Sequence, residues 1–126
     1  MANNKEIKIL KITSKNIESK DIPEDINFII FNKKYPKFSK FNKKIDNLPQ
    51  KLIHLFLKSL FNQKVDNLPK NLTHLSFGDY FNQKINHLPK NLIHLYFTFN
   101  SCFNQKIDNL PKNNFFRTRW YLTKIN

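Results

Sequence analysis

Three histidines recur at intervals of twenty residues: His54, His74 and His94, each two positions after a leucine. Imidazole is the commonest metal ligand and the side chain whose charge changes nearest neutral pH. Three such groups about one strand spacing apart could share a cation or resist joint protonation. However, no Cys, Asp or Glu predicted on the same face completes a ligand set, and repeat duplication also explains the column. We therefore predict no metal site and treat the histidines as candidate contacts for a partner.

The single cysteine, Cys102, could act as a nucleophile if a histidine lay beside it. It falls in a two-residue insertion in the repeat, which we expect on the rim opposite the histidines. One glycine is too few for a phosphate-binding glycine loop, and no paired carboxylates recur along the chain. The sequence thus predicts no catalytic residues, no cofactor and no enzyme activity.

Lysines form a second repeated set, and in most units an acidic residue follows two positions later. The lysines are Lys44, Lys64, Lys84 and Lys106, followed by Asp46, Asp66, Asn86 and Asp108. We interpret this set as a solvated face on which the acids relieve repulsion between stacked lysines. The alternative is a phosphate-binding stripe, whose affinity would fall steeply with salt concentration.

A repeat of about twenty residues must position all these side chains. Units begin at Phe41, Phe61, Phe81 and Phe103, and an L-x-x-L-x-L or L-x-x-L-x-F segment lies within each of the first three. Units that bury their apolar face only against their neighbours stack into a solenoid. The pattern predicts a leucine-rich-repeat-like solenoid with short parallel β-strands on its concave face. Loop, extended and 3-10 segments should form the rest, with little α-helix.

The same spacing continues upstream of the obvious repeats. Residues 26–31 and 7–12 both fit L-x-x-L-x-L, and "IP" at 22–23 stands where "LP" stands in the later units. We therefore predict five strands plus a degenerate sixth, beginning almost at the first residue given. The segment "NKKYPKFSK" at 32–40 lengthens one unit and is interpreted as a loop.

Other columns are constant because stacking requires them. The phenylalanines at the unit starts should form an internal aromatic spine, because equivalent residues stack at the strand spacing. The asparagine after each phenylalanine should bond a turn through its side chain, and asparagines should also supply turn conformations in a chain with one glycine. A proline in each unit stands where no sheet donor is needed. These columns are Phe41, Phe61, Phe81 and Phe103; Asn42, Asn62, Asn82 and Asn104; Pro49, Pro69, Pro89 and Pro111.

The tail "NNFFRTRWYLTKIN" departs from the repeat, because Asn114 and Arg117 fall where leucine is expected. Solenoids need a cap at each end, so we predict that apolar tail residues cover the last unit while the arginines face water. The covering residues would be Phe115, Phe116, Trp120 or Leu122. The whole chain, 1–126, is predicted to be one domain with degenerate repeats at 5–40, clear repeats at 41–113 and a cap at 114–126.

Residues 41–113 resemble the FNIP repeat family, a leucine-rich-repeat variant of slime-mould and giant-virus proteins. The matching phrase is "FNQKIDNLPKNL.HL.F", with lysine where family members often have the proline of Phe-Asn-x-Pro. The resemblance implies a role in protein recognition, in some members beside an F-box that connects the repeats to a ubiquitin ligase. Because residues 1–40 already fit the repeat, we expect no F-box within this chain.

The formal net charge of +13 raises the possibility of nucleic-acid binding. The lysine excess is spread along the chain, and its two arginines, Arg117 and Arg119, lie in the tail. Arginine is the residue suited to bidentate phosphate and base contacts, so its absence from the repeats disfavours this function. Codons rich in A and T also favour lysine, asparagine, isoleucine and phenylalanine.

The expected location is intracellular, in the cytoplasm or, for a viral protein, the host cytoplasm. The first ten residues, "MANNKEIKIL", lack the apolar core of a signal peptide, and the run "FIIF" is too short to cross a bilayer. A lone cysteine suits a reducing compartment. No membrane association is predicted.

Side chains alternate across a strand, so the residues beside each central leucine should point away from the core. We predict that this face binds a protein partner without catalysis. The candidate contacts are His54, Phe56, His74, Ser76, His94 and Tyr96. Two alternatives remain: polyanion or nucleic-acid binding through the lysines, and a truncated repeat copy with no partner of its own.

Overall fold

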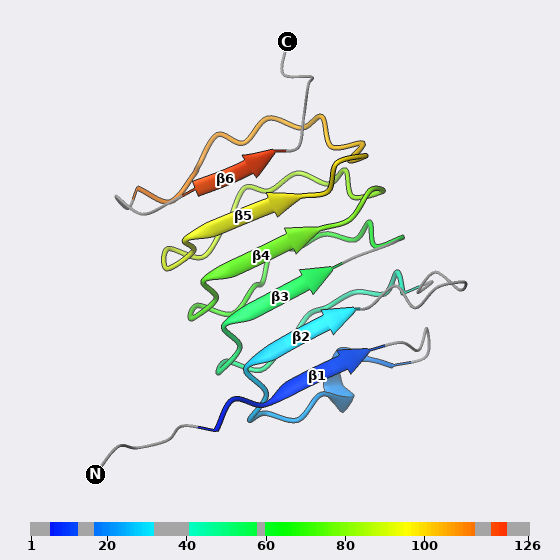
Figure 1. Cartoon of the computed structure of the whole chain (residues 1–126), viewed down its shortest axis with the longest axis vertical. Coiled ribbons are helices and arrows are strands. Elements are labelled where there is room, and N and C mark those ends of the chain that lie inside the picture. The colour runs from blue at the N-terminus through cyan, green and yellow to red at the C-terminus, as the bar shows by residue number, and fades with distance from the viewer. Residues whose placement is uncertain (1–5, 13–16, 32–40, 58–59, 113–116, 121–126) are drawn as a thin grey trace.

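The computed structural model describes residues 6–12, 17–31, 41–57, 60–112 and 117–120. These form a six-stranded parallel sheet in the order β1-β2-β3-β4-β5-β6. Figure 1 shows the strands stacked along the long axis, each joined to the next by a segment that returns along the other side of the coil. The strands are β1 (Ile9–Ile12), β2 (Phe28–Phe31), β3 (His54–Leu57), β4 (His74–Phe77), β5 (His94–Phe97) and β6 (Arg117–Trp120).

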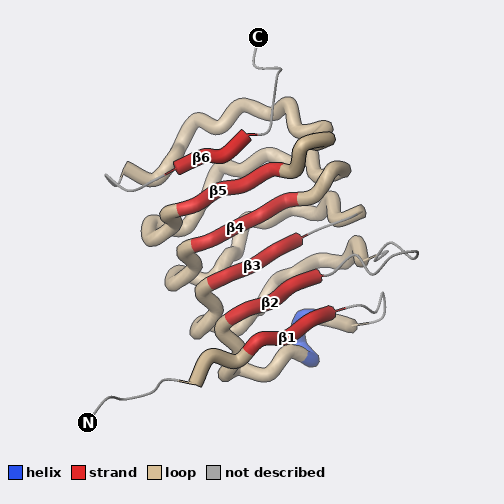
Figure 2. The backbone as a smooth tube through the Cα atoms, viewed as in Figure 1, coloured by secondary structure: helices blue, strands red, loops and turns tan. Residues whose placement is uncertain are grey.

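The predicted solenoid is confirmed, as is its extension toward the N-terminus. Strands β1 and β2 lie inside the upstream segments that fit L-x-x-L-x-L, and both join the same parallel sheet. The sole helix of the described residues is the 3-10 turn η1 (Ser19–Asp21), and loops make up the remainder (Figure 2). The added segment 32–40 lies outside the described residues.

The repeat period fixes the register of the sheet. Each central leucine pairs with its equivalent, so Leu55, Leu75 and Leu95 lie side by side on three adjacent strands and are buried. Alternate residues of the strands, such as Leu57 and Phe77, point into the same core. The apolar columns therefore form one continuous core along the solenoid.

The phenylalanine ladder (Phe41, Phe61, Phe81 and Phe103) lies at the back of this core. Its ring centroids are 6.2, 6.2 and 6.0 Å apart, with the rings nearly parallel. Phe77 of β4 also stacks on Phe81, with centroids 3.7 Å apart. The ladder thus connects the return segments to the sheet, which confirms the predicted aromatic spine.

Prolines begin the turns that lead into β2, β3, β4 and β5. The carbonyl oxygens of Pro49, Pro69 and Pro89 accept hydrogen bonds from the backbone N–H groups three residues later, at 3.1 to 3.2 Å. Pro23 does the same with Ile26 at 3.3 Å. The turn uses only the carbonyl of its first residue, so the N–H that proline lacks is not needed there. The upstream "IP" is therefore the same turn as the later "LP".

The asparagine ladder (Asn42, Asn62, Asn82 and Asn104) joins successive coils. The Oδ1 atom of Asn42 accepts the backbone N–H of Asn62 at 2.8 Å, and the next two pairs repeat this bond at 2.9 and 3.1 Å. The predicted side-chain-to-backbone bonds are present, running between coils. Positive φ is rarer than we expected: within the described residues Asn47 alone has it, at 64°. Most asparagines are thus used for hydrogen bonding.

An Asn62→Ala substitution is expected to lower the free energy of unfolding by about 1–2 kcal/mol. Its Oδ1 accepts both the Asn82 N–H and the side-chain amide of Gln83, so the substitution leaves a half-buried backbone donor without its acceptor. Urea denaturation would measure the loss. Asn71→Ala is the control, because it removes one exposed donor to the Gln50 carbonyl. Equal losses in both variants would contradict the proposed role of the ladder.

Spacing across the coil indicates that the sheet lies on the inner side of a curve. Ring centroids of His54 and His74 are 4.0 Å apart and those of His74 and His94 are 4.5 Å apart. The phenylalanine ladder on the other side has the wider spacings given above. Coils that are closer together at the sheet than at the back must bend toward the sheet, in agreement with the predicted concave sheet face.

The tail continues the sheet with a shifted register. Strand β6 pairs with β5, and the backbone partner of Leu95 is Thr118. Equal unit lengths had placed Arg117 in that column, so the sequence interpretation was wrong by one residue, because the last connection is one residue longer. The proposed capping residues Phe115, Phe116 and Leu122 lie outside the described residues.

Candidate interaction face

Two columns of residues cross the sheet on the side away from the core, here called the sheet face. Strand register places six residues in each column, one from every strand. The first column is Ile9, Phe28, His54, His74, His94 and Arg117, and the second is Lys11, Ile30, Phe56, Ser76, Tyr96 and Arg119. Five of the six predicted contact residues come from three adjacent strands as a partly exposed patch, and the sixth, Ser76, is covered.

The three histidines form a stack of rings, here called the histidine column. Phe28 packs on His54 with a centroid distance of 4.0 Å, and the distances from His54 to His74 and from His74 to His94 are 4.0 and 4.5 Å. The planes of neighbouring histidines differ by 16° and 27°. Between the Thr73 hydroxyl and Nδ1 of His74, a hydrogen bond of 2.8 Å fixes the orientation of the middle ring. The faces of the rings contact one another, so solvent reaches their edges.

This stacking is unsuited to binding a metal between the rings. An imidazole nitrogen binds a metal through a lone pair that lies in the plane of its ring. A cation between two stacked rings would lie above the plane of one ring and below the plane of the other, so neither lone pair would point at it. No group of three or more His, Cys, Asp or Glu residues suitable for a metal occurs in the described part of the chain. The geometry favours contact through the ring edges.

Burial and repulsion from neighbouring histidines keep His54 and His74 neutral. Burial is the main cause that lowers the pKa of His54, from 6.5 to about 4, and the neighbouring His74 and His94 lower it further. Burial, followed by repulsion from His94, also lowers the pKa of His74. At neutral pH these two imidazoles are therefore uncharged and can both donate and accept hydrogen bonds.

Acidification is expected to destabilise the fold through the histidine column. Because folding lowers the pKa of His54 from 6.5 to about 4, the unfolded chain binds more protons in that window, and stability present above pH 6.5 is lost as pH falls. We expect His54 to contribute a loss of about 1 kcal/mol between pH 7 and pH 5, allowing for solvent screening of a partly exposed ring. Thermal melts of the parent and His54→Gln across this range would measure it. Parallel pH profiles for the two proteins would contradict the assignment to His54.

The second column contains two half-buried rings with a covered serine between them. Phe56 and Tyr96 lie on either side of Ser76 in register, and Ser76 is only 3% exposed. A short side chain between two large ones on adjacent strands is readily shielded, because the strands are only about 4.8 Å apart. Ser76 lies on the face where the sequence placed it, but it offers a partner little surface. Burial of this kind depends on side chains of the neighbouring coils, so the sequence of a single repeat unit does not predict it.

The lysines lie away from the sheet face. Lys44, Lys64, Lys84 and Lys106 are exposed, and they line shallow grooves between successive coils together with the acids two residues later. None of these lysines forms an ion pair with any described residue, while Asp66 lies 3.9 Å from Nδ1 of His87. These side chains therefore form a solvated surface of mixed charge.

Cys102 lies at the other end of the strands from the histidines. It is exposed, and its backbone N–H donates to the carbonyl of Asp79 at 2.8 Å in the loop that follows β5. The histidines are the first residues of their strands, whereas this loop follows the last residue of β5. The geometry agrees with the predicted separation of the thiol from the histidine column.

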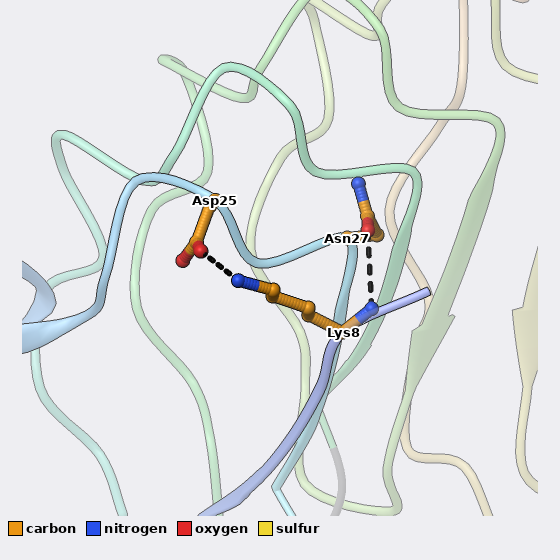
Figure 3. Close-up of polar contacts among 3 residues, drawn as sticks. All are labelled: Lys8, Asp25 and Asn27. Atoms are coloured by element: carbon orange, nitrogen blue, oxygen red, sulfur yellow. Dashed lines mark hydrogen bonds and ion pairs between the residues drawn. The ribbon is translucent and has the colours of Figure 1, made fainter. Parts of the chain in front are cut away.

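The first coil is joined to the second by contacts that sequence reasoning missed. The Lys8 ammonium forms an ion pair with Asp25, and the Lys8 backbone N–H donates to Oδ1 of Asn27 at 3.2 Å (Figure 3). These residues have no equivalents in the later units, so periodicity could not reveal them. A groove beside them is also lined by Ile7 and Ile53, next to the start of the histidine column.

Comparison with known proteins agrees with the sheet and its repeats. The family model described as FNIP Repeat matches residues 61–98. The repeats at 61–98 are FNIP repeats. The resemblance suggested by the repeated phrase is therefore confirmed. No protein with a curated description matches the chain significantly.

The FNIP chain is also similar to a solved structure, CroV588 of the giant virus CroV, described as a novel circular leucine-rich-repeat protein. The two are 36% identical with a TM-score of 0.64, over 79% of this chain. The matched region is 14% of the CroV588 chain, so this chain spans a small part of that protein's length. The likeness shows a leucine-rich-repeat-like fold and indicates a viral relative.

FNIP repeats and leucine-rich-repeat-like solenoids are non-enzymatic kinds of scaffold, and they are commonly used for protein interaction. In the described residues, no helix has the length and apolar character needed to cross a membrane.

Proposed function

We propose that this FNIP-repeat chain is a non-catalytic recognition module that binds a partner protein through the sheet face. The observation that carries the proposal is the group of partly exposed rings on the inner side of the sheet. His54, Phe56 and Tyr96 each present part of a ring there, while the leucines between them are buried. Aromatic residues are enriched at the energetic centres of interfaces because they bury large areas at low entropic cost.

The proposal also rests on rigidity. The rings stand on neighbouring strands in register, and His54 contacts both Phe28 and Phe56, with centroid distances of 4.0 and 6.0 Å. Side chains that are already ordered lose less conformational freedom when a partner binds. A patch of stacked rings on a sheet therefore suits binding better than the exposed lysines, which are long and unpaired within the described residues.

A double substitution of Phe56 and Tyr96 by alanine is expected to weaken partner binding by more than about 1–2 kcal/mol, roughly tenfold or more. Partners would be captured from host-cell lysate by the parent protein, identified, and titrated against each variant. The melting temperature should change little, because neither side chain belongs to the buried core. Lys64→Ala with Lys106→Ala is the matched control and should alter neither property.

Three other results would contradict the proposal. Loss of the partner in the lysine variant alone would place binding on the lysine grooves, with polyanions as the natural ligands. Full affinity in the Phe56→Ala, Tyr96→Ala variant would exclude the sheet face. Capture of no specific protein by a folded parent would favour a repeat copy without a partner of its own.

A further inference from the structure

The two columns of the sheet face contain basic residues and no acidic ones. Neither column contains an aspartate or glutamate on any of the six strands. The exposed Lys11 lies in the second column on β1, and the backbone register assigns Arg117 and Arg119 to the β6 positions of the first and second columns. Of the acids near the ends of the strands, Asp25 pairs with Lys8 and Asp79 accepts the Thr98 hydroxyl, while the exposed Glu6 lines the groove beside Ile7 and Ile53. Charge complementarity therefore points to an anionic ligand.

The histidine column offers that ligand a row of hydrogen-bonding edges. Because the ring faces contact one another at 4.0 and 4.5 Å, a ligand meets ring nitrogens and C–H edges rather than aromatic faces. Carboxylates accept hydrogen bonds from such N–H groups, and the bond strengthens when the imidazole is protonated. A column with a single row of donors suits an extended chain whose acidic groups follow one line.

The part of the sheet face that the structure describes is long enough for a short extended peptide. Six strands at about 4.8 Å span about 24 Å, the length of roughly eight extended residues at about 3.3 Å each. Alternate side chains of such a peptide are about 6.6 Å apart, so two of them cover the three histidines. Single-stranded nucleic acid would instead be expected to use aromatic faces for base stacking, and the faces of the middle ring are already covered.

One end of the first column is apolar and distinguishes the two directions of the peptide. Ile7 is 62% exposed and Ile9 is 54% exposed, and Ile7 and Ile53 line the neighbouring groove together with charged residues such as Glu6 and Lys51. The opposite end of the same column carries the Arg117 position on β6. An apolar residue is therefore favoured at the β1 end, and acidic residues from β3 toward β6.

We propose that the sheet face binds an extended acidic segment of its partner, with carboxylates along the histidine column and an apolar residue against Ile7 and Ile9. This inference rests on the proposed function and specifies the chemistry of the partner. A lipid surface or a rigid folded domain would not fit an inward-curving strip of this width as well as a single extended chain.

Binding should take up protons. In the free protein, burial is the main cause that lowers the pKa values of His54 and His74. Repulsion from His74 and His94 lowers the pKa of His54 further, and repulsion from His94 lowers that of His74. The other groups placed along the column are the apolar Ile9 and Phe28, the Thr73 hydroxyl on His74, and the Arg117 position beyond His94. A carboxylate beside the rings favours their charged form and raises the pKa again. Affinity should therefore rise as pH falls from about 7.5 to about 5.5, where glutamates are still ionised.

The test uses a fluorescein-labelled peptide of two leucines followed by six glutamates, with a six-glutamine peptide as the matched control. Fluorescence anisotropy at near-physiological salt should show at least about tenfold tighter binding of the glutamate peptide. Its affinity should also increase about threefold or more between pH 7.5 and pH 5.5. The variant His54→Gln, His74→Gln, His94→Gln should lose this pH dependence. Equal binding of both peptides would overturn the proposal.

Two further variants keep the test independent of folding defects. Lys11→Glu reverses one charge on the sheet face of β1 and should weaken the glutamate peptide about threefold or more. Lys64→Gln with Lys84→Gln removes charge from the lysine grooves and should leave binding within about twofold. The reverse ranking would place the acidic ligand on the grooves and overturn the proposal, as would tighter, histidine-dependent binding of an eight-nucleotide oligothymidine.

The proposed function can survive the failure of this inference. If the glutamate peptide does not bind, while Phe56→Ala with Tyr96→Ala still loses the captured partner, the sheet face is a binding surface but its ligand is not acidic. If neither the peptide nor the captured partner responds to the sheet-face variants, both proposals are wrong.

Discussion

A Phe81→Ala variant is expected to lose about 3–5 kcal/mol of unfolding free energy, the range typical of removing a buried phenylalanine. Phe81 is fully buried in the middle of the phenylalanine ladder. Its ring lies 6.2 Å from that of Phe61, 6.0 Å from that of Phe103 and 3.7 Å from that of Phe77. The substitution therefore leaves a cavity and removes the contacts of this ring with both neighbouring coils and with strand β4.

The neighbouring Tyr80→Ala variant provides the control. Tyr80 carries a ring of similar size but is 56% exposed, so its removal should change stability by less than about 0.5 kcal/mol. Urea denaturation of both variants, followed by circular dichroism, gives the comparison. Similar midpoints for Phe81→Ala and the parent would show that the ladder does not stabilise the stack.

Much of this fold is predictable from the sequence because a solenoid repeats its own local rules. Strands β1 and β2 are not preceded by the Phe-Asn phrase that begins the later units, yet L-x-x-L-x-L located both, and the "IP" turn also marks β2. Pro23 and Pro69 make the same hydrogen bond despite very different flanking sequences. A pattern that each coil needs in order to bury its apolar side persists even in degenerate units.

The features that the sequence did not reveal depend on neighbouring coils or on connection length. The covering of Ser76 arises from the residues before and after it in the stack, and the stacking of His54 on Phe28 joins a repeat to a degenerate unit. The register of β6 moved by one residue because the last connection is longer than the repeat implies. Such effects are tertiary, and periodicity within one unit contains no information on them.

The histidine column illustrates how architecture and recognition can share residues. Stacked rings at 4.0 and 4.5 Å contribute packing between strands, which alone would favour duplication of histidine with the repeat. The same stacking leaves ring edges at the surface. The candidate interaction face could be predicted as a set of positions, whereas its chemistry depends on ring orientation, which only the structure provides.

Leu75 and Ser76 offer the sharpest comparison between the core and the sheet face, because they are adjacent in β4 and point to opposite sides. Leu75→Ala is expected to cost about 2–5 kcal/mol, since Leu75 is buried between Leu55 and Leu95 and its removal leaves a cavity in the middle of the sheet. Because each coil buries its apolar side only against its neighbours, the loss should lower the stability of the adjacent coils as well. Thermal and urea unfolding would measure it.

Ser76→Ala should change stability by less than about 0.5 kcal/mol or increase it slightly. The Ser76 hydroxyl is buried and makes no hydrogen bond to any described residue, so its removal relieves the cost of burying a polar group. If Ser76→Ala were the more damaging of the two, the inward and outward sides of β4 would be reversed. The sheet face would then consist of the leucine columns, and the histidine column would belong to the core.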